Sequence, residues 1–372
     1  MPAKTIAYDH QIFSLQQYGG ISRYFCEIAT RISDECDHRA RIVAPLHFND
    51  HLAHSQAPCI GLHLPLRFGR AARLCRAANA VLTPPLLAGL APSVVHRTYY
   101  AAHPGYARAP LVITVFDMIH ELYPKLFPPG DPMFERKRLS VEAADHVICI
   151  SQSTANDLMR LFNVPERKIS VTYLGYSDVF RQWRETDSAS TGGRRAVLYV
   201  GHRGGYKNFQ NALKAYAGSS ALRSNFDFLA FGGPPFDATE RAFIDSLRVR
   251  PGSVTWRTGS DEDLARAYRE AQALIYPSLY EGFGIPPLEA MASGCPVACS
   301  NTSSLPEVVG SAALLFDPSD ADAVQDAMER VCTSDQTRRR LVVGGTERAQ
   351  QFSWTRCAAD TVRAYANVLG GA

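Results

Sequence analysis

Two glutamates, Glu281 and Glu289, frame a short loop in the C-terminal third of the chain, within the segment YPSLYEGFGIPPLEA. An ionised carboxylate only accepts hydrogen bonds, and a single carboxylate can accept from two hydroxyl groups at once. Carboxylates on both sides of one loop would suit a ligand with sugar hydroxyls at both of its ends. Taken alone, the same spacing would more often mean two solvated glutamates on a surface loop.

The loop between the glutamates has the features of an anion site. It follows an apolar run, Ala273 to Tyr276, which predicts a buried strand. It leads into a predicted helix with Pro286 and Pro287 at its first positions, where a missing N–H costs nothing. Amide groups and the dipole at the start of a helix favour negative charge. The prolines lack such amides, so a phosphate is expected at the amides of Phe283, Gly284 and Ile285. Together with the two glutamates, this phosphate site favours a nucleotide sugar.

A second glycine-rich loop, GHRGGYKN, follows the apolar run Ala196 to Val200. It carries two cations four positions apart, Arg203 and Lys207, which suit the charges of a diphosphate. The loop lacks the G-x-G-x-x-G pattern, and no acidic residue follows about 20 positions later, which disfavours a nicotinamide dinucleotide. The alternative is a solvated basic turn.

The segment YPSLYEGFGIPPLEAMASGCPV resembles the E-x7-E signature of the retaining glycosyltransferases of family 4, which have the GT-B fold. The resemblance extends over nearly the whole chain and is closest to the bacterial mannosyltransferase-like branch that builds O-antigen and capsule repeats. It implies that Glu281 holds hydroxyls of the donor sugar and that Glu289 holds the ribose. It also implies that Arg203 and Lys207 neutralise the donor diphosphate and the leaving nucleotide.

The resemblance assigns further residues to the donor. The segment YGGISRY looks like the N-terminal glycine loop that approaches the donor phosphate, with Arg23 in the first turn of the following helix. A lone glycine pair more often makes only a tight turn. The resemblance also places residues 258–259 beside the nucleobase. The predicted donor-binding residues beyond those named above are Gly19, Gly20, Thr258, Gly259 and Tyr280.

Polar residues follow two predicted buried strands, residues 94–96 and 111–116. Open α/β sheets bind ligands beyond the carboxyl ends of their strands, so these residues are candidates for a pocket wall. Asp117 and His120 lie in TVFDMIHELYP, which resembles a family segment that lines the reaction centre and the acceptor site. We predict that both face the acceptor, and His120 could accept or relay a proton near neutral pH. Each alone could equally be a satisfied polar group at a strand end.

Three patterns could suggest a metal ion, but none is assigned one. His47 and His51 have a spacing known from helical zinc ligands, but the adjacent Asn49-Asp50 marks a loop. Two D-x-D pairs could hold a divalent metal, Asp261/Asp263 and Asp320/Asp322. Both pairs lie in the first turns of predicted helices, where carboxylates act as caps. The cations of the second glycine loop make a metal unnecessary, and the resemblance implies none.

Between Asp50 and Asp117 the chain has no acidic residue but six arginines. Four of them recur at helical spacing with apolar residues between them: Arg67, Arg70, Arg73 and Arg76. A basic amphipathic helix can lie on an anionic membrane, and an ordinary solvated helix face is the equal alternative. The proline-rich segment that follows, 83–92, is predicted not to be helical throughout.

The composition is that of a soluble globular protein. Of the 372 residues 46% are hydrophobic and 20% charged, and no apolar run approaches the ~18 residues of a membrane span. A net charge of +3 does not indicate a nucleic-acid partner. Nine irregularly spaced cysteines and an N-terminus without a signal-peptide pattern indicate a cytoplasmic protein, with peripheral contact to the membrane left open.

The length and the order of the predicted elements indicate two α/β domains with doubly wound parallel sheets. The resemblance implies that the domains face a cleft and that a C-terminal helix crosses back, as in the GT-B fold. We predict an acceptor-binding domain at 1–178, a nucleotide-sugar-binding domain at 196–352, and a helix at 353–372 that packs on the first domain. The polar stretch 175–195 is the predicted linker.

The predicted reaction is the retaining transfer of a hexose, without cofactor or metal, to a glycan or lipid-linked acceptor in surface polysaccharide synthesis. On resemblance alone, GDP-mannose is the favoured donor. The family is thought to use front-face attack, so no protein nucleophile is required. The alternatives are a nucleotide-sugar epimerase of the same fold, which needs no acceptor, and a non-catalytic protein that only binds a sugar nucleotide.

Overall fold

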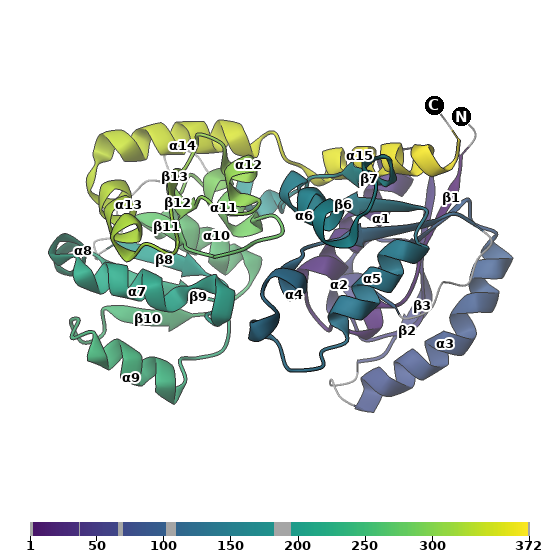
Figure 1. Cartoon of the computed structure of the whole chain (residues 1–372), viewed down its shortest axis with the longest axis horizontal. Helices are drawn as coiled ribbons and strands as arrows, with labels where there is room; N and C mark the ends of the chain where they lie inside the picture. The colour runs from purple at the N-terminus through teal and green to yellow at the C-terminus, as the bar shows by residue number, and fades with distance from the viewer. Residues whose placement is uncertain (1–2, 37, 66–69, 102–108, 182–194, 371–372) are drawn as a thin grey trace. The chain divides into compact units, whose positions relative to one another are not determined.

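The chain forms two compact units in the computed structural model, which describes residues 3–36, 38–65, 70–101, 109–181 and 195–370 (Figure 1). The N-terminal unit contains the residues up to Gly175 together with the segment from Ser353 onwards. The C-terminal unit runs from Tyr176 to Phe352. Most of the predicted linker, residues 182–194, lies outside the described residues.

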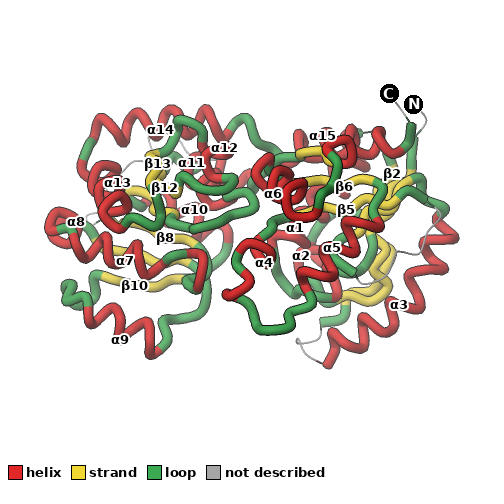
Figure 2. The backbone as a smooth tube through the Cα atoms, viewed as in Figure 1, coloured by secondary structure: helices red, strands yellow, loops and turns green. Residues whose placement is uncertain are grey.

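The N-terminal unit is built on a seven-stranded parallel sheet with the order β3-β2-β1-β4-β5-β6-β7. Most of its strands are runs of buried apolar residues, as expected for a sheet enclosed by helices (Figure 2). The order reverses between β1 and β4, and ligands bind at the carboxyl ends of strands beside such a reversal. The strands are β1 (Thr5–Tyr8), β2 (Arg39–His47), β3 (Cys59–His63), β4 (Val94–Arg97), β5 (Leu111–Val115), β6 (His146–Cys149) and β7 (Ile169–Val171).

The helices of this unit form because their apolar residues recur at helical spacing. α1 (Gly20–Glu35) buries Phe25, Ile28 and Ile32 on one face. α6 (Gln152–Phe162) begins after the capping residue Ser151, whose hydroxyl oxygen accepts a hydrogen bond from the Thr154 amide (3.0 Å). The other helices are α2 (Asp50–His54), α3 (Arg70–Leu90), α4 (Ile119–Leu122), α5 (Met133–Ala143) and α15 (Trp354–Val368), with short 3-10 turns at Ile12–Ser14, Pro124–Leu126 and Glu166–Lys168.

The prediction that residues 83–92 are not regular helix throughout was wrong for most of the segment. α3 continues through Pro84 and Pro85 and ends at Leu90. The turns on both sides of the prolines are anchored, because Thr83 bonds to the His10 ring (2.9 Å) and Leu87 is buried against the sheet. These contacts offset the hydrogen bond that proline removes from a helix. No helix in the described part of the chain is long and apolar enough to span a membrane.

The last helix of the chain, α15, belongs to the N-terminal unit and packs along α1 (Figure 1). A buried chain of hydrogen bonds fixes it there. The Tyr365 hydroxyl lies 3.0 Å from the Tyr8 hydroxyl and 2.7 Å from Nδ1 of His96, whose Nε2 lies 2.9 Å from the Thr114 hydroxyl. Burial lowers the pKa of His96 to about 3, so the ring is neutral at ordinary pH and can both donate and accept.

The C-terminal unit repeats the design with a six-stranded parallel sheet in the order β10-β9-β8-β11-β12-β13. The predicted strand at 273–276 is confirmed as β11 with the same bounds, and the order reverses between it and β8. The carboxyl ends of β8 and β11 are therefore the expected ligand edge of this unit. The strands are β8 (Ala196–Val200), β9 (Asp227–Phe231), β10 (Val254–Arg257), β11 (Ala273–Tyr276), β12 (Val297–Ser300) and β13 (Leu314–Phe316).

Capping residues start several helices of this unit. Ser260 and Asp263 form a reciprocal capping box at the start of α10 (Asp261–Glu270), and Asp320 caps α13 (Ala321–Thr333), so both D-x-D pairs lie at helix starts, as predicted. The remaining helices are α7 (Phe209–Gly218), α8 (Ser220–Asn225), α9 (Ala238–Ser246), α11 (Ile285–Ala292), α12 (Leu305–Val309) and α14 (Asp335–Ala349), with 3-10 turns at Asp178–Arg181 and Gly205–Lys207.

Candidate active site

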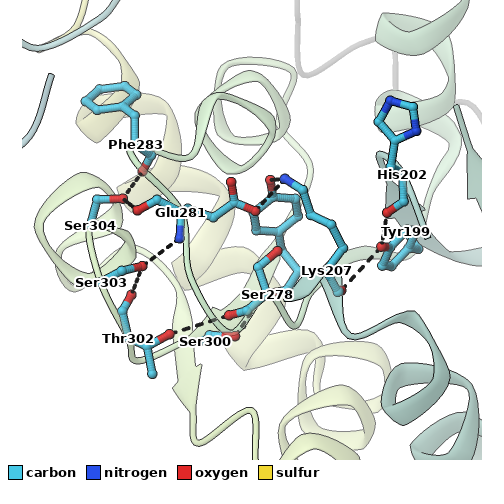
Figure 3. Close-up of polar contacts among 11 residues, drawn as sticks. Tyr199, His202, Lys207, Ser278, Glu281, Phe283, Ser300, Thr302, Ser303 and Ser304 are labelled. Atoms are coloured by element: carbon cyan, nitrogen blue, oxygen red, sulfur yellow. Dashed lines mark hydrogen bonds and ion pairs between the residues drawn. The ribbon is translucent and has the colours of Figure 1, made fainter. Parts of the chain in front are cut away.

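The loop that carries Glu281 lies between β11 and α11 and is held by the loop after β12 (Figure 3). The Ser304 hydroxyl donates to the carbonyl oxygens of Glu281 (2.8 Å) and Phe283 (2.7 Å). The Ser303 hydroxyl oxygen accepts from the Glu281 amide (2.9 Å), and Thr302 donates to the Leu279 carbonyl (3.0 Å). These hydrogen bonds within the protein hold the backbone of the glutamate loop. No sequence motif indicates this role for the three hydroxyl residues.

Gly284 makes the turn from this loop into α11. Its φ of 111° is in the left-handed region, and a Cβ atom there would lie 2.7 Å from Cδ2 of Leu305. Ile285 is the first residue of the helix and the two prolines follow it, so residues 283–285 end at a helix start, as predicted. Within the loop, Tyr280 and Phe283 are buried, at 4% and 3% exposure.

Glu289 is a buried carboxylate on α11, only 7% exposed. Its Oε2 accepts a hydrogen bond from the Tyr268 hydroxyl of α10 (3.2 Å). Burial, and then the charge of Glu289, raises the pKa of Tyr268, so the tyrosine stays a neutral donor. The carboxylate is thereby held in one orientation.

The structure brings together Lys207 and Glu281, which the sequence places in separate motifs. Lys207 follows β8 and Glu281 follows the neighbouring strand β11. The lysine Nζ lies 2.6 Å from Oε1 of Glu281 and 3.3 Å from the Tyr276 hydroxyl (Figure 3). Burial, and then the charge of Glu281, raises the pKa of Tyr276. The pair lies at the edge where this sheet is expected to bind its ligand.

Arg203 lies in a different environment from Lys207. Its Nε lies 2.7 Å from Oε1 of Glu240, and its Nη1 donates to the Gly232 carbonyl (3.0 Å). The guanidinium also lies over the Phe236 ring, 4.9 Å from its centroid, and the side chain is 3% exposed. The arginine therefore fastens the turn after β9 to the glycine loop, and its assignment to the diphosphate stays a prediction. The neighbouring His202 is exposed (Figure 3).

The other residues predicted to bind the donor nucleotide sugar lie at two other places in the structure. Thr258 and Gly259 are exposed after the edge strand β10, where a Cβ on Gly259 would lie 2.5 Å from Oδ2 of Asp263. Gly19 and Gly20 lie at the start of α1 in the N-terminal unit, after the carboxyl end of β1. Their roles toward a donor stay predictions.

In the N-terminal unit Asp117 and His120 lie on the short turn after β5. The Asp117 side chain is 38% exposed, and its Oδ1 accepts a hydrogen bond from the Ile119 amide (3.1 Å). The His120 ring stacks on Phe127 with 3.9 Å between centroids, and its Nε2 lies 4.0 Å from Oδ2 of Asp131. Its buried Nδ1 has no hydrogen-bond partner among the described residues. Burial, and then the charge of Lys137, lowers the pKa of His120.

Lys137 is the residue of this region that the sequence analysis missed. Its Nζ lies 2.7 Å from Oε2 of Glu121 and 2.9 Å from the Asp117 carbonyl oxygen, and its side chain is only 1% exposed. It stands between two arginines in the run ERKRL, which looks like an ordinary solvated helix face. Only the fold reveals that the middle cation of this run is buried.

Two family models match the chain and together cover most of it. "Glycosyltransferase Family 4" matches residues 18–178, and "Glycosyl transferases group 1" matches residues 182–348. The O-antigen chain mannosyltransferase B of Escherichia coli is 31% identical over 264 residues, 68% of this chain and 69% of that protein. The chain belongs to the family-4 glycosyltransferases.

Another relative agrees with this assignment, and solved structures share the fold. The O-antigen chain mannosyltransferase RfbU of Salmonella typhimurium is 29% identical over 59% of this chain and 60% of its own length. Sucrose-phosphate synthase from Thermosynechococcus elongatus (TM-score 0.76, 18% identity, 99% and 100% of the two chains) and WaaG, a glycosyltransferase of lipopolysaccharide biosynthesis (0.69, 17%, 99% and 100%), share the fold. The protein is thus a glycosyltransferase with the GT-B fold.

The two models divide the predicted site residues of this glycosyltransferase between them. The first covers the glycine loop at the start of α1 and the turn with Asp117 and His120. The second covers the pair Lys207–Glu281 and the buried Glu289. Each matched segment therefore contains one set of predicted site residues, which follow the carboxyl ends of the strands of its own parallel sheet.

Proposed function

We propose that this glycosyltransferase is a retaining enzyme that moves mannose from GDP-mannose to a glycan or lipid-linked acceptor of a surface polysaccharide. The observation that carries the proposal is the Lys207–Glu281 pair, 2.6 Å apart, at the ligand edge of β8 and β11. The choice of mannose is supported by the names of the relatives, several of which are O-antigen mannosyltransferases.

The donor would bind to the C-terminal unit. Its diphosphate would lie at the amides of residues 283–285, at the start of α11, where the helix dipole favours negative charge. Glu281 would accept hydrogen bonds from the sugar hydroxyls and Glu289 from the ribose. An ammonium group has three N–H donors, so Lys207 can keep its bond to Glu281 and also donate to a phosphate oxygen.

The proposed chemistry needs no protein nucleophile and no metal. The acceptor oxygen forms a bond to the anomeric carbon on the face that the diphosphate leaves, and the bond from this carbon to the diphosphate oxygen breaks. The proton of the acceptor hydroxyl goes to the departing phosphate. Lys207 and the loop amides stabilise the charge that develops on this phosphate, which is a main source of rate enhancement in such sites.

The acceptor would bind to the N-terminal unit beside Asp117 and His120. Asp117 is partly exposed and can accept a hydrogen bond from an acceptor hydroxyl. The lowered pKa of His120 favours its neutral form, which can orient a hydroxyl group or relay its proton. Support for this placement comes from the position of both residues after the carboxyl end of β5.

We further propose that α3 contacts an anionic membrane, where a lipid-linked acceptor would be found. Arg73 and Arg76 are exposed on this helix. The helix also exposes four large apolar side chains, Leu74 (70%), Val81 (72%), Leu82 (43%) and Leu86 (38%). The side chains of Arg67 and Arg70 lie outside the described part of the structure. Exposed apolar residues with arginines, in a stretch without acidic residues, suit an anionic interface. We place the protein at the cytoplasmic face of this membrane, in line with cysteines that are free thiols.

Incubation with a panel of nucleotide sugars, with and without acceptor glycans, tests the function. We expect nucleotide release that depends on acceptor and is fastest with GDP-mannose, and a product with the anomeric configuration of the donor, measured by NMR coupling constants. Conversion of the nucleotide sugar alone to an epimer would make the protein an epimerase. Binding of a donor, measured by calorimetry, without turnover on any acceptor would make it a sensor. An inverted product would refute the retaining mechanism.

A further inference from the structure

A buried lysine ties together the turn that carries Asp117 and His120. Lys137, on α5, is 1% exposed, and its Nζ lies 2.7 Å from Oε2 of Glu121, 2.9 Å from the Asp117 carbonyl oxygen and 3.5 Å from Oδ1 of Asp117. The Glu121 side chain is also 1% exposed. Lysine and glutamate are almost never fully buried unless they are paired. One ammonium group thus joins Asp117, at the start of the turn, to Glu121 within α4.

The turn needs such support because it is very short. α4 has only four residues, Ile119–Leu122, and a single helical turn is not stable by itself. Lys137 bonds to Glu121 within α4 and to Asp117 just before it, and the lysine Nζ also lies over the Tyr100 ring, 5.6 Å from its centroid. His120 lies between the two bonded residues in the sequence. Its orientation therefore depends on a side chain that comes from another helix.

A buried ion pair is a weak source of stability, because the desolvation of two charges can exceed their attraction. A well-packed apolar pair could contribute as much to stability, but it could not donate a hydrogen bond to the Asp117 carbonyl oxygen. Oε1 of Glu121 is moreover buried without a hydrogen-bond partner among the described residues, which adds to the cost of this arrangement. The pair therefore calls for an explanation other than stability.

We propose that Lys137 is a positioning residue for the acceptor side of the reaction. It fixes Asp117 and orients His120, so that both side chains are placed for the acceptor hydroxyl. This inference rests on the proposed function, in which these two residues face the acceptor. In this proposal Lys137 touches neither substrate, but it determines where the side chains of Asp117 and His120 lie.

The charge of Lys137 has a second effect on His120. The titratable groups around this ring are Asp117 and Glu121 from its own segment, Asp131 from the following loop, and Lys137 from α5. The three carboxylates favour the charged ring, whereas burial and the lysine favour the neutral ring. Removal of the lysine charge should therefore raise the pH at which His120 becomes protonated.

The variant Lys137→Met tests the proposal, with Lys168→Met as a matched control. Lys168 bonds to the Val141 carbonyl (2.9 Å) near the other end of α5 and makes no contact with the turn in the described structure. For Lys137→Met we expect kcat/KM for the acceptor to fall roughly 100-fold, the effect of a misplacement of about 1 Å. The Kd for the donor nucleotide should change less than twofold, and Lys168→Met should behave as wild type in both respects.

Two further measurements do not depend on turnover. Amide hydrogen exchange over residues 117–122 should become faster in Lys137→Met but not in Lys168→Met. The NMR titration of the His120 ring, assigned with His120→Asn, should move to higher pH in Lys137→Met. If the wild type transfers to no acceptor, the proposed function fails, and these two measurements still decide whether Lys137 holds the turn.

A double variant covers the case in which Lys137→Met fails to fold because it leaves Glu121 charged, buried and unpaired. Lys137→Met with Glu121→Leu replaces both charged partners, which can be nearly neutral for stability. A folded double variant that still loses acceptor turnover supports the proposal. Full activity of the double variant, or a wild-type acceptor kcat/KM together with unchanged exchange in the single variant, would overturn it.

Discussion

Lys207 and Glu281 constrain each other in the C-terminal unit. Their side chains are 16% and 11% exposed, and removal of one would leave the other charge buried without its partner. A truncation such as Glu281→Ala would therefore mix loss of function with loss of stability. Substitutions that keep the shape and remove the charge are the informative ones.

Glu281→Gln should impair turnover more than folding. The amide keeps one acceptor oxygen, but it loses the charge that strengthens hydrogen bonds to sugar hydroxyls and holds Lys207. A hydrogen bond to a charged group contributes about 1.5–3 kcal/mol, so we expect kcat/KM to fall roughly 10- to 100-fold. Steady-state kinetics with the preferred donor measures this. Glu270→Gln, an exposed residue on α10, is the control, and equal turnover of the two variants would remove Glu281 from the site.

The pH dependence of acceptor turnover should reflect His120. Burial and Lys137 lower its pKa, so the ring stays neutral at a lower pH than the usual value of about 6.5. Protonation removes its ability to accept a hydrogen bond. We therefore expect kcat/KM for the acceptor to fall on the acid side with a midpoint below about 6.5. His120→Gln should abolish this limb of the profile, and a limb that persists in the variant would assign it to another group.

Single residues could be predicted from the sequence where a local motif identifies them. Glu281, Glu289 and Lys207 lie in such motifs, and the structure places them in the segments that follow β8 and β11, while their roles toward a donor stay predictions. Lys137 and Ser304 have no motif, because their partners are 16 to 23 positions away in the sequence and are defined only by the fold. For the same reason the partner of Arg203, Glu240 on α9, could not be foreseen.

At the scale of elements, buried strands were predicted well and one helix was not. The strand at 273–276 is a continuous apolar run, a pattern that a parallel sheet requires on both faces. α3 was cut short in the prediction because prolines usually end helices. The anchors that allow it to continue, Thr83 on His10 and Leu87 in the core, are again contacts with distant segments.

α3 should bind anionic vesicles through two kinds of side chain. The variant with Arg67, Arg70, Arg73 and Arg76 changed to serine should lose most co-sedimentation with phosphatidylserine vesicles, because each basic residue near the surface contributes about 1 kcal/mol. Leu74→Ser with Val81→Ser should lose binding as well, since these exposed side chains would enter the interface. Both variants should keep donor binding. Undiminished sedimentation of the arginine variant would leave α3 as an ordinary solvated helix.

At the scale of the whole molecule, neither strand order nor the return of the last helix follows from local patterns. The orders of the two sheets were expected only in outline, from the doubly wound class that the resemblance implies. The position of α15 depends on contacts across most of the chain, such as that between Tyr8 and Tyr365. Here the resemblance to a family supplied what composition and periodicity could not.

Tyr365→Phe should therefore destabilise the beginning of the chain, although the residue lies near its end. The change removes the hydroxyl that bonds to Tyr8 and His96, and it leaves buried polar atoms without a partner at a cost of about 1–3 kcal/mol. Hydrogen exchange should become faster in β1 and β4 of the N-terminal unit and stay unchanged in β8 and β11 of the C-terminal unit. Tyr18→Phe, at an exposed position, is the control. Equal loss of protection in both units would mean that they unfold as one cooperative body, and unchanged exchange in β1 would mean that the buried hydroxyl does not hold α15.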